Sequence, residues 1–323
     1  MNKDATPPSA LRKIFIGNDG LRAGWSLLIF SALIAAIAFS GNTIGHKIHP
    51  PAPKAANPDT EITPLFGFLT EGISFLVVGI VTWIMSKIEG RPNSVYGLGG
   101  SRKLPHFLAG LAWGVACVSL LVLTLWKAGL LVIDGRLLFG ADVARYGAIW
   151  LVDFLLVGLL EEYLTRGYLQ YTLSRGLAGV YQWVFKTRHS RALGFWTSAV
   201  IFSILFGLGH GHNQGESPIG LLSASLASMV FCFSLWRTGS LWWAIGFHTS
   251  WDWGQSFLYG VPNSGTMVQH HLLVTHPAGK PILSGGTTGP EGSIFIVAIV
   301  VVIGLIIFFT LPRAHYDNAA HSA

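Results

Sequence analysis

Charged side chains are scarce in this chain: Asp, Glu, Lys and Arg make up 11% of its 323 residues, against about 25% in typical soluble domains. A water-soluble globule of this length could not cover its surface with so few charges. The composition therefore excludes a soluble enzyme. It also excludes a disordered chain, because disorder combines high charge with low hydrophobicity, whereas 51% of these residues are hydrophobic.

Cysteine is nearly absent as well. The two that occur, Cys117 and Cys232, lie inside apolar runs, which excludes a disulfide-stabilised secreted domain. The 21 Lys and Arg residues outnumber the 15 Asp and Glu residues, but they form no dense patch or stripe. We therefore expect no nucleic acid among the partners of this protein.

Long apolar runs are what the sequence has instead. Most of them approach the roughly 20 residues that a helix needs to cross the hydrocarbon core of a membrane. They cover residues 24–41, 65–86, 106–126, 147–172, 193–212, 219–236, 241–258 and 293–311. The sequence thus predicts an all-α polytopic transmembrane helical bundle of about eight spans.

The distribution of basic residues predicts the orientation. Alternate connecting segments hold 15 of the 21 Lys and Arg residues on one side and 6 on the other. Under the positive-inside rule, both termini then lie in the cytoplasm. We expect a multi-pass protein of a bacterial-type inner membrane, with an interfacial segment at 1–23, one membrane-embedded domain at 24–311 and a cytoplasmic tail at 312–323.

Two further patterns concern the fold. Gly110 and Gly114 form a small-x-x-x-small pair in the third run, which predicts that another helix approaches closely there. Residues 259–292 are rich in glycine and proline, which predicts an irregular connection.

Ionisable residues inside apolar runs cost several kcal/mol each and are functional candidates by default. Glu162 and Arg166, in the fourth run, stand at i and i+4 with the acid first, the favoured order for an ion pair. That pairing leaves Glu161 for another task, and a carboxylate in a low-dielectric cavity suits a general base. The alternative is a charged helix end at the membrane surface, with Arg166 reaching towards water.

Histidines supply the other candidates. His210 closes the fifth run, where it binds a metal, relays protons or caps the helix. His248 and Asp252, in the seventh run, share one helical face, which suits joint contact with an ion or a substrate group, or a buried hydrogen bond without chemistry. Together with Glu161 these residues come from three helices, and such a set can bind and activate a water.

The three motifs resemble, in order, those of the CPBP family of intramembrane proteases, which includes the CAAX prenyl endopeptidases and the Abi bacteriocin-immunity proteins. The motifs read Glu-Glu-x-x-x-Arg at 161–166, Phe-x-x-x-His at 206–210 and His-x-x-x-Asp at 248–252. The resemblance implies a CPBP-like core at about 147–258. The first three runs and the last lie outside it.

This resemblance implies an endopeptidase in which Glu161 and His210 activate water for attack on a peptide carbonyl. His248 and Asp252 would stabilise the oxyanion, and the substrate would be a membrane-associated or lipid-modified peptide. The remaining motif residues, Glu162 and Arg166, would support the site. The partners are then a peptide or protein substrate in or at the membrane and the lipid bilayer.

Position 252 departs from the prenyl-protease branch, which usually has Asn there. An Asn amide can donate to an oxyanion, but an ionised Asp cannot. Asp252 must therefore be protonated, orient His248 or ligate a metal. Because the family is known both as metalloproteases and as metal-free glutamate proteases, both types stay open. His210, His248 and Asp252 would be an ordinary ligand set for a divalent metal such as zinc, although the chain has no His-Glu-x-x-His motif.

Two other functions remain as alternatives. The first is a non-catalytic membrane scaffold or a bacteriocin-immunity-type protein. The second is a transporter, which should show interrupted helices at matched positions in both halves. The polar residues of this chain concentrate in the fourth to seventh runs, and this pattern argues against a transporter.

Overall fold

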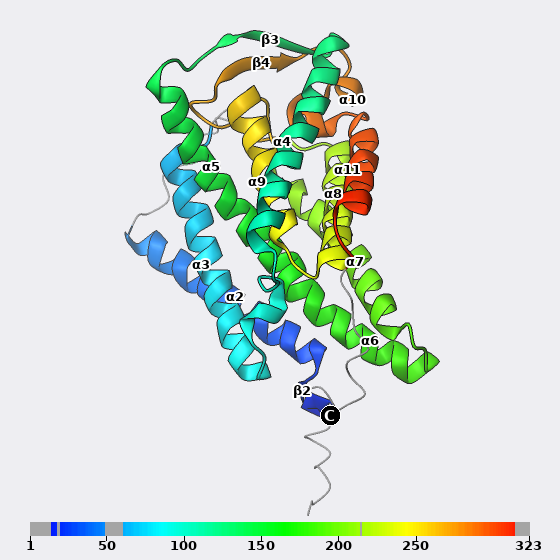
Figure 1. Cartoon of the computed structure of the whole chain (residues 1–323). Coiled ribbons are helices and arrows are strands. Elements are labelled where there is room, and N and C mark those ends of the chain that lie inside the picture. Colours follow the sequence, from blue (N-terminus) through cyan, green and yellow to red (C-terminus); the bar gives the residue numbers. More distant parts are fainter. Residues whose placement is uncertain (1–13, 18–19, 49–60, 214, 314–323) are drawn as a thin grey trace, which may run out of the picture.

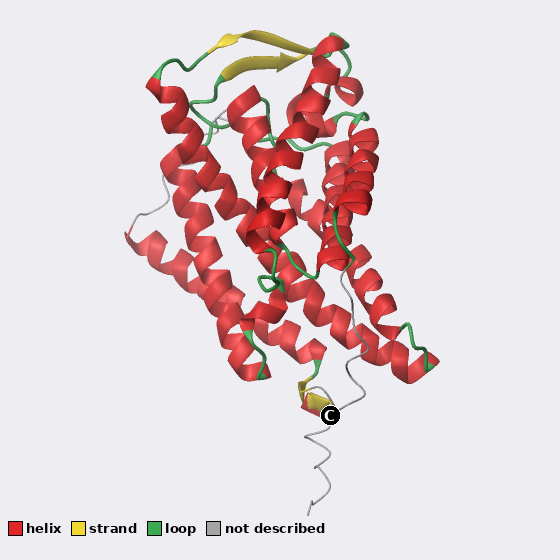
Figure 2. Cartoon of the chain, viewed as in Figure 1, coloured by secondary structure: helices red, strands yellow, loops and turns green. Residues whose placement is uncertain are grey.

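The computed structural model describes residues 14–17, 20–48, 61–213 and 215–313. Within these residues the chain forms a helical bundle, with two small two-stranded sheets (Figures 1 and 2). The expected cytoplasmic tail at 312–323 lies almost wholly outside the described residues, as does most of the segment at 1–23.

The long helices follow the apolar runs. They are α2 (Ala23–Ile48), α3 (Pro64–Glu89), α4 (Lys103–Lys127), α5 (Ala141–Glu162), α6 (Tyr171–Phe185), α7 (Ser190–Gly209), α8 (Pro218–Thr238), α9 (Trp242–Trp253) and α11 (Ile296–Thr310). Short helical turns connect them: η1 (Asn93–Tyr96), η2 (Tyr163–Gln170), η3 (His210–His212), η4 (Gly254–Tyr259), α10 (Pro281–Ser284), η5 (Gly286–Thr288) and η6 (Pro290–Gly292).

Six helical segments among the described residues are long and apolar enough to cross a membrane. The prediction of an all-α transmembrane bundle is therefore confirmed, whereas the count of eight spans and the cytoplasmic termini stay predictions. The seventh and eighth runs form α9, with 12 residues, and α11, with 15 residues. Helix α9 lies in the centre of the bundle, surrounded by other helices (Figure 1).

Local sequence signals explain where several helices begin and end. The Thr63 side chain caps α3 by accepting a hydrogen bond from Phe66 N, and Ser217 caps α8 in the same way through Gly220 N. A proline follows each cap, where its missing N–H is no loss. Both helices end at a glycine in the left-handed conformation, Gly90 and Gly239, each with φ of 66°.

The fourth apolar run is longer than predicted. Its helix does not end near residue 172: α5 continues through the π-helical turn η2 into α6, as one segment of 45 residues, Ala141–Phe185. A straight helix of that length would be about 68 Å long, roughly twice the thickness of the hydrocarbon core. Only its first part can therefore span the membrane, and α6 extends beyond it.

Helix α4 makes more extensive contact with α9 than any other pair of described helices makes. A side chain at Gly110 would collide with the backbone of Trp243 and Phe247, and one at Gly114 with Phe247 and Ser250. The predicted close approach at the glycine pair is confirmed. Around it lies the largest core cluster, built from α4, α8, α9 and α11.

The connection at 259–292 is more ordered than its composition predicts. Strand β4 (Leu273–Pro277) pairs antiparallel with β3 (Leu131–Arg136), which follows α4. A second short pair, β1 (Ile16–Gly17) and β2 (Gly20–Leu21), precedes α2. The β3–β4 sheet covers one end of the bundle, and the turn between α6 and α7 lies at the other end (Figure 1).

Candidate active site

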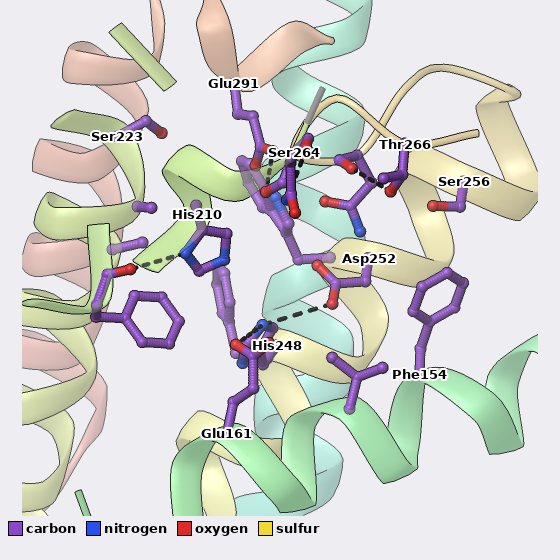
Figure 3. Close-up of a pocket in the computed structure, with 18 of the residues that line it drawn as sticks. Phe154, Glu161, His210, Ser223, His248, Asp252, Ser256, Ser264, Thr266 and Glu291 are labelled. Atoms are coloured by element: carbon purple, nitrogen blue, oxygen red, sulfur yellow. Dashed lines mark hydrogen bonds and ion pairs between the residues drawn. The ribbon is translucent and has the colours of Figure 1, made fainter. Parts of the chain in front are cut away.

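One cavity, of about 290 Å³, is lined by all four residues that the sequence predicts to be catalytic. Glu161 comes from the end of α5, His210 follows α7, and His248 and Asp252 belong to α9. Their side chains meet around the same space (Figure 3). The packing of α5, α7 and α8 around α9 therefore brings together residues that are far apart in the sequence.

Small residues make this convergence possible. A side chain at Gly158 would come within 3.1 Å of Thr249 Oγ1 and 3.2 Å of Ile245 O, so the glycine lets α5 approach α9 one turn before Glu161. Gly207 has the same role between α7 and α8, where Ser225 fills the space that a side chain would need.

His248 is the centre of the polar network. Its Nδ1 lies 3.1 Å from Glu162 Oε1, while its Nε2 lies 3.4 Å from Asp252 Oδ2 and 3.7 Å from Glu161 Oε2. Three carboxylates from two helices thus face one imidazole. Because Glu162 accepts at Nδ1, that nitrogen carries a proton, and Nε2 is the one directed at the cavity.

Glu162 and Arg166 form the predicted ion pair, with 2.8 Å between Oε1 and Nη1 and no exposure of either side chain. The guanidinium also lies over the rings of Phe206 and Phe231, at 4.4 and 5.6 Å from their centroids. A buried, paired charge of this kind belongs to the interior of the bundle. The alternative of a charged helix end with Arg166 reaching towards water is therefore wrong.

His210 occupies the opposite side of the cavity from Asp252 (Figure 3). Its Nδ1 lies 2.8 Å from the Phe206 carbonyl oxygen, which can only accept. Nδ1 therefore donates, and a neutral His210 keeps an acceptor lone pair on Nε2. His210 directly follows α7 and lines the same cavity as Glu161.

The predicted metal ligands are His210, His248 and Asp252. Among residues 14–17, 20–48, 61–213 and 215–313, no group of three or more His, Cys, Asp or Glu side chains is arranged to hold a metal ion. His210, His248 and Asp252 share the cavity without forming such a group. The residues as placed do not fit a metal, and the metal set stays a prediction.

Three acidic residues at this cavity have no part in the motifs: Glu71, Asp153 and Glu291. Asp153 approaches α3 where Gly67 leaves room, since a side chain at Gly67 would come within 2.8 Å of Asp153 Oδ1. Glu291 accepts hydrogen bonds from Ser264 and from Gln255. The first two lie inside apolar runs, where an isolated acid is itself the signal of a functional cavity. Glu291 carries no such signal.

Comparison with known proteins agrees with the motifs. No curated protein and no solved structure matches the chain. Residues 143–254 match the family model described as "Type II CAAX prenyl endopeptidase Rce1-like", and this range contains all three motifs. Residues 143–254 thus form a domain similar to the Rce1-like type II CAAX prenyl endopeptidases, which matches the CPBP-type family that the motifs resemble.

Proposed function

We propose that the protein is an intramembrane endopeptidase that hydrolyses a peptide bond in a membrane-associated or lipid-modified peptide. The observation that carries the proposal is the single cavity lined by Glu161, His210 and His248 inside an otherwise apolar bundle. The family match supports the protease class. A water held between Glu161 and His210 would be the nucleophile.

Two acceptors are available for that water. Glu161 Oε2 is buried without a hydrogen-bond partner in the structure, and His210 keeps a lone pair on Nε2 because its Nδ1 is bound to Phe206 O. Glu161 takes a proton from the water as its oxygen attacks the peptide carbonyl carbon. When the C–N bond breaks, the same carboxyl returns the proton to the leaving amine.

The oxyanion needs donors at the other side of the carbonyl. His248 would donate from Nδ1 to Glu162 and, with both ring nitrogens protonated, would present Nε2–H to the cavity. Asp252 lies 3.4 Å from that nitrogen and would repel an oxyanion if it were ionised. We infer that the Asp252 carboxyl carries a proton during the attack and donates it in a hydrogen bond.

Substitutions at position 252 test this assignment. Asp252→Asn keeps a donor of similar size and is expected to retain activity within about tenfold, whereas Asp252→Leu removes it and should lower kcat by about 10²- to 10³-fold. Steady-state cleavage rates of the two variants give the comparison. A loss of similar size in both variants would show that an ionised carboxylate is needed at this position.

The proposed function itself is tested by a cleavage assay on protein reconstituted in vesicles. The substrates are membrane-anchored peptides with farnesyl, palmitoyl or no lipid, and mass spectrometry identifies the products. Wild type should cleave at least one of these classes, and His210→Ala should be slower by about 10²-fold or more. Full activity of His210→Ala would refute the assignment. A biological effect without any hydrolysis would favour the scaffold or immunity-type function.

A further inference from the structure

A second cavity, of about 690 Å³, opens at the part of the bundle that contains η1, η2, α6, the start of α7 and the end of α8. No motif and no comparison assigns it a role. Its lining contains four arginines and no carboxylate: Arg91, Arg166, Arg175 and Arg191. A cavity with this charge is unusual inside a protein that carries so few charged residues.

Two carboxylates that do not line the cavity, those of Glu89 and Glu162, compensate part of this positive charge. Glu89 lies 3.6 Å from Arg91 Nε and 3.9 Å from Arg175 Nη2, and Glu162 pairs with Arg166. Arg191 is exposed and has no ion pair among the described residues. The lining thus carries four guanidinium groups, whereas the carboxylates that pair with three of them do not line the cavity.

Two buried side chains of the lining have hydrogen-bond donors without an acceptor in the structure. Arg166 and Gln170 are each 1% exposed. The Nε and Nη2 atoms of Arg166 and the Nε2 atom of Gln170 have no hydrogen-bond partner in the structure. Leaving a buried donor unsatisfied costs about 1–3 kcal/mol. A ligand rich in acceptor oxygens would remove that cost.

The side chains that line the cavity favour a ligand with both a phosphate group and an apolar part. Phosphate oxygens are preferred partners of guanidinium groups, which bind them through two parallel N–H donors. Apolar side chains complete the lining, among them Val95, Phe195 and Leu235, and they suit the glycerol and acyl part of a lipid. Basic pockets between transmembrane helices on the cytoplasmic side bind anionic headgroups in this way, and the positive-inside prediction places this end of the bundle there.

We propose that this cavity binds a phosphate-bearing anion, either the headgroup of an anionic phospholipid or a free phosphate. The site shares Arg166 with the Glu162 pair, but its binding does not depend on the proposed protease activity. A direct binding measurement therefore tests it separately from the cleavage assays.

The test uses the purified full chain in detergent with radiolabelled phosphatidylglycerol, and phosphatidylcholine as the uncharged-headgroup comparison. Arg191→Gln removes an exposed guanidinium of the lining, so the variant should fold normally. Arg188→Gln is the matched control, because Arg188 is also exposed, lies three residues away in the turn before α7 and does not line the cavity. We expect phosphatidylglycerol to bind wild type and Arg188→Gln alike, and Arg191→Gln at least about tenfold more weakly.

Inorganic phosphate distinguishes the two sources of the anion. Competition by millimolar phosphate against phosphatidylglycerol, absent in Arg191→Gln, would support a site that also takes the free ion. Phosphatidylglycerol binding that phosphate does not displace would support a lipid site. Equal binding of phosphatidylcholine and phosphatidylglycerol, or equal weakening in Arg188→Gln and Arg191→Gln, would overturn the proposal.

Discussion

Replacing Glu161 by glutamine is expected to lower the rate of peptide cleavage by at least about 10²-fold, because the amide cannot take a proton from water. The fold should survive the change. The Glu161 side chain is 30% exposed in the cavity, and its Oε2 lies 3.7 Å from His248 Nε2. Single-turnover cleavage in vesicles measures the rate, and the unfolding midpoint of the purified variant measures the fold.

A second acid of the same cavity provides the control. Glu71, from α3, lines the cavity but has no role in the proposed mechanism. Glu71→Gln removes one negative charge from the same space and should leave the rate within several-fold of wild type. If Glu71→Gln and Glu161→Gln lower the cleavage rate by the same factor, the loss comes from the change in the charge of the cavity. Glu161 is then not the base.

Replacing Glu162 by alanine is expected to destabilise the protein by about 3–5 kcal/mol, the usual loss when one partner of a buried ion pair is removed. The change leaves the guanidinium of Arg166 buried without its carboxylate, and it also removes the acceptor at His248 Nδ1. The yield of monodisperse protein and its thermal unfolding midpoint should fall together.

The paired substitution separates the ion pair from the packing around it. Glu162→Gln with Arg166→Met removes both charges, keeps an acceptor for His248 and fills a similar volume. It should be less destabilising than either single removal of charge. If instead Glu162→Ala accumulates normally while turnover disappears, Glu162 acts in the chemistry and the division of roles between the two acids is wrong.

The apolar runs predict most of the membrane fold, because each run is found in a helix. Helix ends were predictable where a cap marks them, as at Thr63 and Gly90. The end of the fourth run was not, because the helix continues past residue 172 into α6, where Arg175 and other polar residues interrupt the apolar pattern. Arg166 and Gln170, within the π-helical turn η2, are buried by helices that come from elsewhere in the sequence.

The site was predictable to the extent that its residues stand out locally. An acid or an imidazole in an apolar run is visible in the sequence, and the convergence of Glu161, His210 and His248 on one cavity followed from that reasoning. The sequence pattern could not predict which further acidic residues the packing of the helices brings to the cavity. Asp153 enters the cavity because Gly67 yields space on α3, and Glu291 enters it from the connection after β4, which composition describes only as irregular.

The central claim is that Glu161 and His210 act on one water, and the most direct test is the cleavage rate of the double variant Glu161→Gln/His210→Ala. Two groups that act as a unit are not additive, so removal of the second adds little once the first is gone. We predict that the double variant cleaves within about threefold of the slower single variant. A rate reduced by the product of the two single losses would contradict the account, because it would mean that the two side chains act on separate steps.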